Sequence, residues 1–103
     1  MVIINLSLKT LKINLRVPHV GWNECFVKKK SLLFKGINDN KNFYFTHSFS
    51  PIKVKDAYIL GTTWYGNELI TAVEKDNIYG VQFHPEKSQL NGLLLIENFS
   101  KIS

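Results

Sequence analysis

The sequence predicts an α/β fold in which strands predominate and one helix closes the chain. Several runs rich in apolar and β-branched residues have the length of strands, and some alternate between apolar and polar positions. Near the end of the chain, apolar residues instead have the spacing of an amphipathic helix. The repeated strand and helix units expected of a complete doubly wound domain are mostly missing.

The first half of the chain contains three apolar segments. Residues 11–16 alternate between apolar and polar side chains, as in a half-buried strand, and Pro18 ends this run. A short apolar segment reaches Leu32–Phe34. The aromatic run Phe43–Phe49 predicts a further strand, and we expect Pro51 to limit its extension.

The second half predicts a β-hairpin followed by the helix. Thr62–Val73 and Ile78–Phe83 are two β-rich runs, and Asp76 and Asn77 between them suit a tight turn. Gln89–Ile102 has apolar residues at helical spacing and predicts the closing helix. No linker divides the sequence, so we expect residues 1–103 to belong to one domain.

The residues that follow this hairpin carry the strongest chemical signal. The stretch Gly80–Ser88 reads GVQFHPEKS, with His84 and Glu86 two positions apart after an apolar run. A nucleophilic triad needs a general base and a third group that orients it, and this pair can supply both. Pro85 would bend the backbone so that both side chains reach one pocket. In an arbitrary sequence, the same pair would more often be a surface ion pair.

A metal site is the alternative interpretation of His84 and Glu86. The H-x-E pattern also occurs in zinc deaminases, but their signature requires a downstream P-C-x-x-C pair. The sole cysteine, Cys25, lies upstream. We therefore expect neither a metal nor another cofactor, and no disulfide can form within the chain.

Composition limits the classes of partner. The net charge is +5, but the basic residues are scattered except at Lys28–Lys30, and such a run usually forms a solvated face. We expect no binding to nucleic acid. The apolar runs are too short to cross a bilayer, so we expect no membrane association and a cytoplasmic location.

The GVQFHPEKS stretch closely resembles the C-terminal signature of the class I glutamine amidotransferases. This resemblance implies a Cys-His-Glu triad with His84 as the base and Glu86 as the orienting group. It also implies the C-terminal half of a flavodoxin-like domain, matched over residues 17–99. In such a domain, glutamine is hydrolysed to glutamate, and ammonia passes to a partner synthase without entering bulk water.

Further segments resemble one branch of this family, the glutaminase subunits of imidazole glycerol phosphate synthases. These segments are Pro18–Asn23, Tyr44–Ser48 and Asn91–Phe99. The branch implies that the partner is a cyclase and that the protein serves histidine biosynthesis. Two alternatives remain: a related glutaminase that serves a synthase of surface sugars, which Thr63–Glu68 also resembles, or a noncatalytic remnant that binds a synthase.

The resemblance also assigns roles outside the triad. It implies that the strand around His47, Ser48 and Phe49 helps to hold the carboxylate and amine of glutamine. It implies contact with the partner synthase at Trp22, Asn23, Tyr44 and Lys87. For the aromatic residues in this second set, simple packing in the core is the competing interpretation.

The family's nucleophile is missing from this sequence. It lies in a G-x-C-x-G turn, and no such turn occurs here. Cys25 follows Trp22-Asn23-Glu24, in a segment that the family uses differently, so we interpret it as a bystander. We expect the nucleophile about twenty residues before Met1 in a longer gene, and the isolated chain to be inactive.

Overall fold

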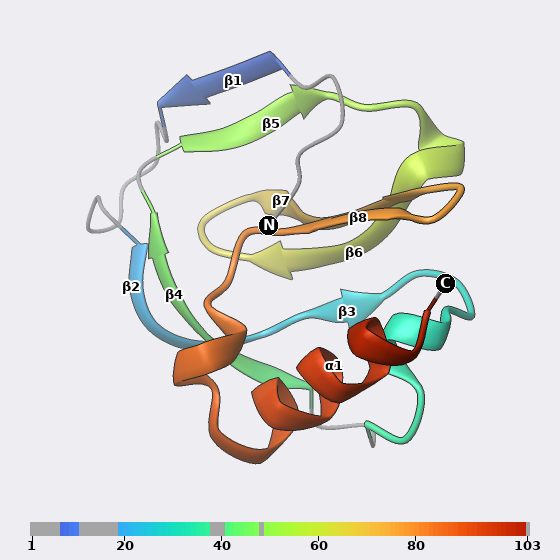
Figure 1. Ribbon diagram of the computed structural model, residues 1–103. Coiled ribbons are helices and arrows are strands. Elements are labelled where there is room, and N and C mark those ends of the chain that lie inside the picture. Colours follow the sequence, from blue (N-terminus) through green and yellow to red (C-terminus); the bar gives the residue numbers. More distant parts are fainter. Residues whose placement is uncertain (1–6, 11–18, 38–40, 48, 103) are drawn as a thin grey trace.

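The computed structural model describes residues 7–10, 19–37, 41–47 and 49–102 (Figure 1). Its strands are β1 (Ser7–Thr10), β2 (His19–Glu24), β3 (Phe26–Val27), β4 (Asn42–His47), β5 (Phe49–Lys53), β6 (Ile59–Trp64), β7 (Glu68–Lys75) and β8 (Ile78–Val81). The α-helix is α1 (Gln89–Lys101), and the short 3-10 helices are η1 (Leu32–Phe34), η2 (Asp56–Tyr58) and η3 (Pro85–Lys87). The predicted strand-rich α/β fold with a closing helix is confirmed.

The described strands pair in an antiparallel manner. β3, β6, β7 and β8 form one sheet in that order, β2 pairs with β4, and β1 pairs with β5. In Figure 1, β1 and β5 lie at the end of the molecule opposite α1. The curved pair of β2 and β4 approaches α1 through η3, which precedes the helix.

The predicted hairpin is formed by β7 and β8. Lys75 pairs with Ile78, so the loop between them consists of Asp76 and Asn77 alone. Asp76 has a φ of 55°, a left-handed conformation that aspartate tolerates in tight turns. β8 ends at Val81 rather than at Phe83. The chain therefore leaves the sheet before it reaches the histidine.

Besides the end of β8, further predicted strand boundaries are wrong, and one predicted strand lies outside the described residues. The strand predicted at Phe43–Phe49 is β4, which ends at His47. Thr62–Val73 is two strands, because the chain turns between Trp64 and Glu68, where Gly66 has a φ of 74°. Pro51 lies inside β5 instead of limiting a strand. Since the described partner of β5 is β1 alone, the strand tolerates a proline. The strand predicted at residues 11–16 falls outside the described residues.

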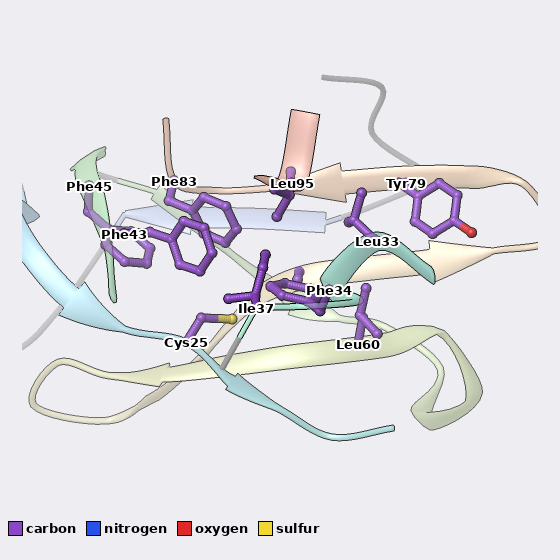
Figure 2. Packing of buried hydrophobic residues seen from close by; sticks show 11 residues of the cluster. Cys25, Leu33, Phe34, Ile37, Phe43, Phe45, Leu60, Tyr79, Phe83 and Leu95 are labelled. Atoms are coloured by element: carbon purple, nitrogen blue, oxygen red, sulfur yellow. The ribbon is translucent and has the colours of Figure 1, made fainter. Parts of the chain in front are cut away.

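The core is built around stacked aromatic side chains from β4 and from the segment after β8. The rings of Phe43 and Phe83 stack with centroids 3.9 Å apart, and Phe45 meets Phe83 edge to face at 5.7 Å (Figure 2). Leu95 of α1 is also fully buried in this cluster. These contacts anchor the segment after β8, and His84 follows directly.

The closing helix buries only part of its apolar surface. Gly92 and Leu95 face the core, whereas Leu90 and Leu93 are 66% and 65% exposed. The helix prediction is therefore confirmed, but its apolar residues are divided between two faces.

Candidate active site

Backbone hydrogen bonds hold His84–Glu86, the HPE segment, against β4. The His84 N–H donates to the Tyr44 carbonyl at 2.8 Å, and the Lys87 N–H donates back to the His84 carbonyl at 3.1 Å. Pro85 begins the short helix η3, where its lack of an N–H leaves no bond unmade. The proline bend expected from the sequence thus appears as one helical turn.

His84 and Glu86 form a direct pair. Nδ1 of His84 lies 3.0 Å from Oε2 of Glu86. Because an ionised carboxylate can only accept, Nδ1 is the donor, and Nε2 is left available for another partner. Their side chains are 39% and 59% exposed, so a substrate could reach them. A base oriented by a carboxylate has this arrangement in nucleophilic triads.

The electrostatics favour an ionised Glu86. Its own backbone N–H, followed by the hydrogen bond from His84, lowers the pKa of the carboxyl below its ordinary value. A carboxylate that remains ionised can stabilise an imidazolium on His84 during proton transfer.

Ser88 is a buried polar residue of this segment to which the sequence analysis gave no role. Ser88 is only 1% exposed. Its hydroxyl accepts a hydrogen bond from the Tyr44 N–H and donates one to the His84 carbonyl. The sequence signal that could have identified Ser88 is its place at the end of the nine-residue motif, directly before the helix. A pattern in the sequence does not show that its partner is β4.

In the segment predicted to bind substrate, His47 of β4 pairs with His19 of β2. His47 is buried, and its Nε2 lies 2.8 Å from Nδ1 of His19, a residue that the sequence analysis did not identify. His19 stacks between Tyr65, at 3.8 Å, and Phe45, at 4.8 Å. Ser48 lies outside the described residues. Phe49 is described only as the first residue of β5.

The predicted partner-binding residues gather near the HPE segment. Trp22 and Tyr44 are cross-strand neighbours on β2 and β4, with ring centroids 6.1 Å apart. Trp22 is 49% exposed, so core packing does not account for it. Tyr44 also carries the carbonyl that binds the His84 N–H, and Lys87 lies exposed in η3.

Asn23 links this region to a second exposed tryptophan. Its amide donates to the Trp64 carbonyl at 2.9 Å, and Trp64 is 64% exposed. The sequence analysis included Trp64 only within the segment Thr63–Glu68 and gave it no role of its own, although a tryptophan at the end of a strand next to a turn is an available signal.

Cys25 is a poor nucleophile in this structure. It is 1% exposed, and its Sγ lies 3.6 Å from the Thr71 hydroxyl. Burial raises the pKa of the thiol to about 11, only partly opposed by the hydrogen bond to Thr71. Since the thiolate is the reactive form, the position and ionisation of Cys25 agree with its interpretation as a bystander.

Metal-binding and membrane-spanning features are both missing from the described ranges. Within them, no group of three or more histidine, cysteine, aspartate or glutamate side chains is placed to hold a metal ion. Among the same residues, no helix is both long enough and apolar enough to cross a membrane.

Comparison with known proteins decides the family. The family model "Glutamine amidotransferase class-I" matches residues 2–101. The chain belongs to the class I glutamine amidotransferases. A crystal structure from Thermoplasma acidophilum, described as that of a GMP synthase component, has the same fold. This amidotransferase-family chain superposes on it with a TM-score of 0.74 at 20% identity, covering 95% of the chain and 48% of that structure.

The curated relatives come from the branch that the motifs resemble. The chain is 46% identical over 90 residues to imidazole glycerol phosphate synthase subunit HisH 1 of Campylobacter jejuni, covering 87% of the chain and 44% of the relative. It is 46% identical to subunit HisH of Pyrococcus furiosus, with coverages of 86% and 46%. It is 50% identical to subunit HisH 2 of Vibrio vulnificus, with coverages of 84% and 40%. The amidotransferase chain thus spans less than half the length of these relatives.

Proposed function

We propose that this chain supplies the base half of a glutaminase active site, in a protein that delivers ammonia to a partner synthase. The observation that supports this most strongly is the His84–Glu86 pair, 3.0 Å apart, on the motif that resembles the family signature. The whole domain then hydrolyses glutamine to glutamate. Residues 1–103 form one part of that domain.

The proposed chemistry uses a cysteine thiolate as the nucleophile. The thiolate attacks the amide carbon of glutamine, and His84 gives a proton to the departing nitrogen, which leaves as ammonia. Water, activated by the same imidazole, then cleaves the thioester to give glutamate and restore the thiol. We assign the thiolate to the part of the domain that the relatives have and this chain does not span, because Cys25 is buried with a raised pKa.

Substrate and partner contacts complete the proposal. The backbone around His47, Ser48 and Phe49 helps to hold the carboxylate and amine of glutamine. The synthase covers the face that carries Trp22, Asn23, Tyr44 and Lys87. The exposure of Trp22 and its edge-to-face contact with Tyr44 support this second assignment, because exposed aromatics commonly mark interfaces.

We propose imidazole glycerol phosphate synthase as the assembly, with a cyclase as partner, in the cytoplasmic synthesis of histidine. The names of the curated relatives favour this branch over a sugar-modifying synthase. In this proposal the whole assembly is a lyase, and its glutaminase subunit is a hydrolase.

A chimeric protein tests the proposed activity. The N-terminal part of the Campylobacter jejuni relative is fused to this chain where their alignment begins, and glutamate release is measured with the partner synthase of that organism present. We expect activity from the chimera and none from the chain alone. His84→Asn should reduce kcat by on the order of a hundredfold or more.

A matched carboxylate serves as the control. Glu86→Gln should lower kcat, whereas Glu97→Gln should leave it unchanged, because Glu97 is a similarly exposed carboxylate that pairs with Lys101 on α1. Glutamate release by the chain alone, or a chimera that is indifferent to His84→Asn, would refute the proposed division of the active site.

A further inference from the structure

We propose that Ser88 is a positioning residue, whose hydroxyl fixes the backbone of His84 on strand β4 and so holds the base and its carboxylate in register. The inference rests on the proposed function of His84 as a base. It assigns a task to a buried hydroxyl that the triad itself does not use.

Three hydrogen bonds form a closed ring. The Tyr44 N–H donates to the Ser88 hydroxyl at 2.9 Å, the hydroxyl donates to the His84 carbonyl at 2.6 Å, and the His84 N–H donates to the Tyr44 carbonyl at 2.8 Å. The backbone donor and acceptor of both His84 and Tyr44 thus take part. The ring fixes a catalytic loop to a strand that lies far away in the sequence.

The ring needs a hydroxyl at Ser88 because this group must both accept and donate a hydrogen bond. A serine oxygen can donate one hydrogen bond while it accepts others, and here it joins a backbone donor to a backbone acceptor. His84 itself is the extended N-cap of η3, with φ −99° and ψ 98°, and its carbonyl also accepts the Lys87 N–H of that turn. The Ser88 residue is 1% exposed, so water could not easily replace its hydroxyl.

Gly92 allows the helix to pack tightly enough to hold this ring. Its N–H donates to the Ser88 carbonyl at 3.2 Å, and a Cβ at this position would overlap the Pro85 carbonyl oxygen. Gln89, between Ser88 and the helix body, has a φ of 52°, a conformation that costs energy in a residue other than glycine. Strain of this kind persists where the surrounding contacts determine the geometry, and here they determine where Ser88 sits.

By holding the His84 main chain, the ring orients the His84 imidazole toward the Glu86 carboxylate. The ring holds the His84 main chain, and the Nδ1–Oε2 contact to Glu86 spans only two residues from that point. If the hydroxyl is removed, the His84 carbonyl keeps the Lys87 N–H but loses its bond to Ser88. We expect the imidazole and the carboxylate then to separate for a larger part of the time.

The test uses Ser88→Ala in the chain as it stands, with nuclear magnetic resonance as the readout. We expect the Tyr44 amide proton to exchange about tenfold faster, because it loses its acceptor. We also expect the pKa of the Glu86 carboxyl to rise toward its ordinary value, since His84 contributes to its lowering. Ser88→Thr, which keeps the hydroxyl, should restore both.

Ser100→Ala is the matched control, because Ser100 also donates to a backbone carbonyl of α1, at 2.7 Å, but is exposed and remote from the ring. If the Glu86 carboxyl titrates unchanged in folded Ser88→Ala, the positioning role is refuted. Should that variant fail to fold, Ser88→Cys preserves the size of the side chain and is judged by the same criterion. These readouts need no glutamine turnover, so they can fail or succeed independently of the proposed glutaminase activity.

Discussion

Among single residues, solvent access separates the groups that could take part in nucleophilic chemistry. The imidazole of His84 is partly exposed and paired with a carboxylate, whereas the thiol of Cys25 is sealed in the core. Neither fact follows from residue type, since histidine and cysteine both occur in cores and in active sites. The position of each residue in the fold decides its reactivity.

The buried thiol of Cys25 leads to a labelling prediction. Because burial raises its pKa from the ordinary 9.0 to about 11, the thiolate fraction near neutral pH should be about a hundredfold lower than for a free cysteine. We expect a disulfide reagent to label the folded chain at least that much more slowly than the chain in denaturant. Equal labelling rates would show that the thiol is accessible.

The histidine pair of β2 and β4 leads to a pH prediction. Burial, and then the neighbouring His47, lowers the pKa of His19 from 6.5 to about 4. Between these values the unfolded chain binds a proton that the folded chain does not, so stability should fall as the pH drops from 6.5 toward 4. At about 1.4 kcal/mol per pH unit, the loss approaches about 3 kcal/mol at the lower limit.

Denaturant unfolding at about pH 7.5 and about pH 5 measures this effect. His19→Phe keeps an aromatic ring between Phe45 and Tyr65. In this variant, the difference in the free energy of unfolding between the two pH values should become smaller. Ser100→Ala, at an exposed position of α1, changes no titratable group, so it is the control and should keep the pH dependence of the parent chain. An unchanged pH dependence in His19→Phe would exclude His19 as the source.

Among the elements, the β7–β8 hairpin and α1 determine the position of the HPE segment. Phe83 is anchored by stacking on Phe43, and η3 then leads directly into the helix. The segment is therefore held at both ends by packed structure. Its local geometry depends on how closely the helix approaches it.

This close approach makes the effect of Gly92→Ala opposite in sign to helix propensity. Alanine usually stabilises a helix interior by about 1 kcal/mol relative to glycine. Here the new Cβ would overlap the Pro85 carbonyl and crowd Ser88, so we expect destabilisation by about 1–3 kcal/mol. Thermal unfolding compares it with Ser100→Ala on the exposed face, and a raised melting temperature for Gly92→Ala would contradict this packing.

For the whole molecule, the distribution of apolar surface suggests that the chain associates. Leu90 and Leu93 protrude from α1, and Trp22 and Trp64 protrude from the strands. Trp22 and Leu90 line one hollow in the surface, and exposed apolar groups that lie close together commonly mark surfaces that bind another protein.

We therefore expect the isolated chain to self-associate as its concentration rises. Sedimentation velocity should detect dimers or larger species. Leu93→Lys, which places a charge on the exposed face of α1, should shift the equilibrium toward monomer. Asn77→Lys, in the exposed turn of the β7–β8 hairpin, adds the same charge away from α1 and controls for an unspecific effect of charge. A parent chain that remains monomeric at all concentrations tested would contradict this prediction.

Much of the fold could be predicted because its signals are local. The two-residue turn at Asp76 and Asn77 and the helical spacing after Gln89 depend only on neighbouring residues, and both predictions are confirmed. The break between β6 and β7 was missed because Gly66 stands in a run of β-forming residues. Pro51 was misjudged because its tolerance depends on which partners a strand has.

The sequence by itself determined the hairpin, the closing helix and a nine-residue motif specific enough to indicate the family. Local patterning and residue chemistry suffice for these. Only the tertiary structure decided that Cys25 is sealed, that His19 pairs with His47, and that Ser88 joins His84 to Tyr44, its partner 44 positions earlier in the chain. Such contacts depend on which surfaces the packed core brings together, and no spacing along the chain encodes that directly.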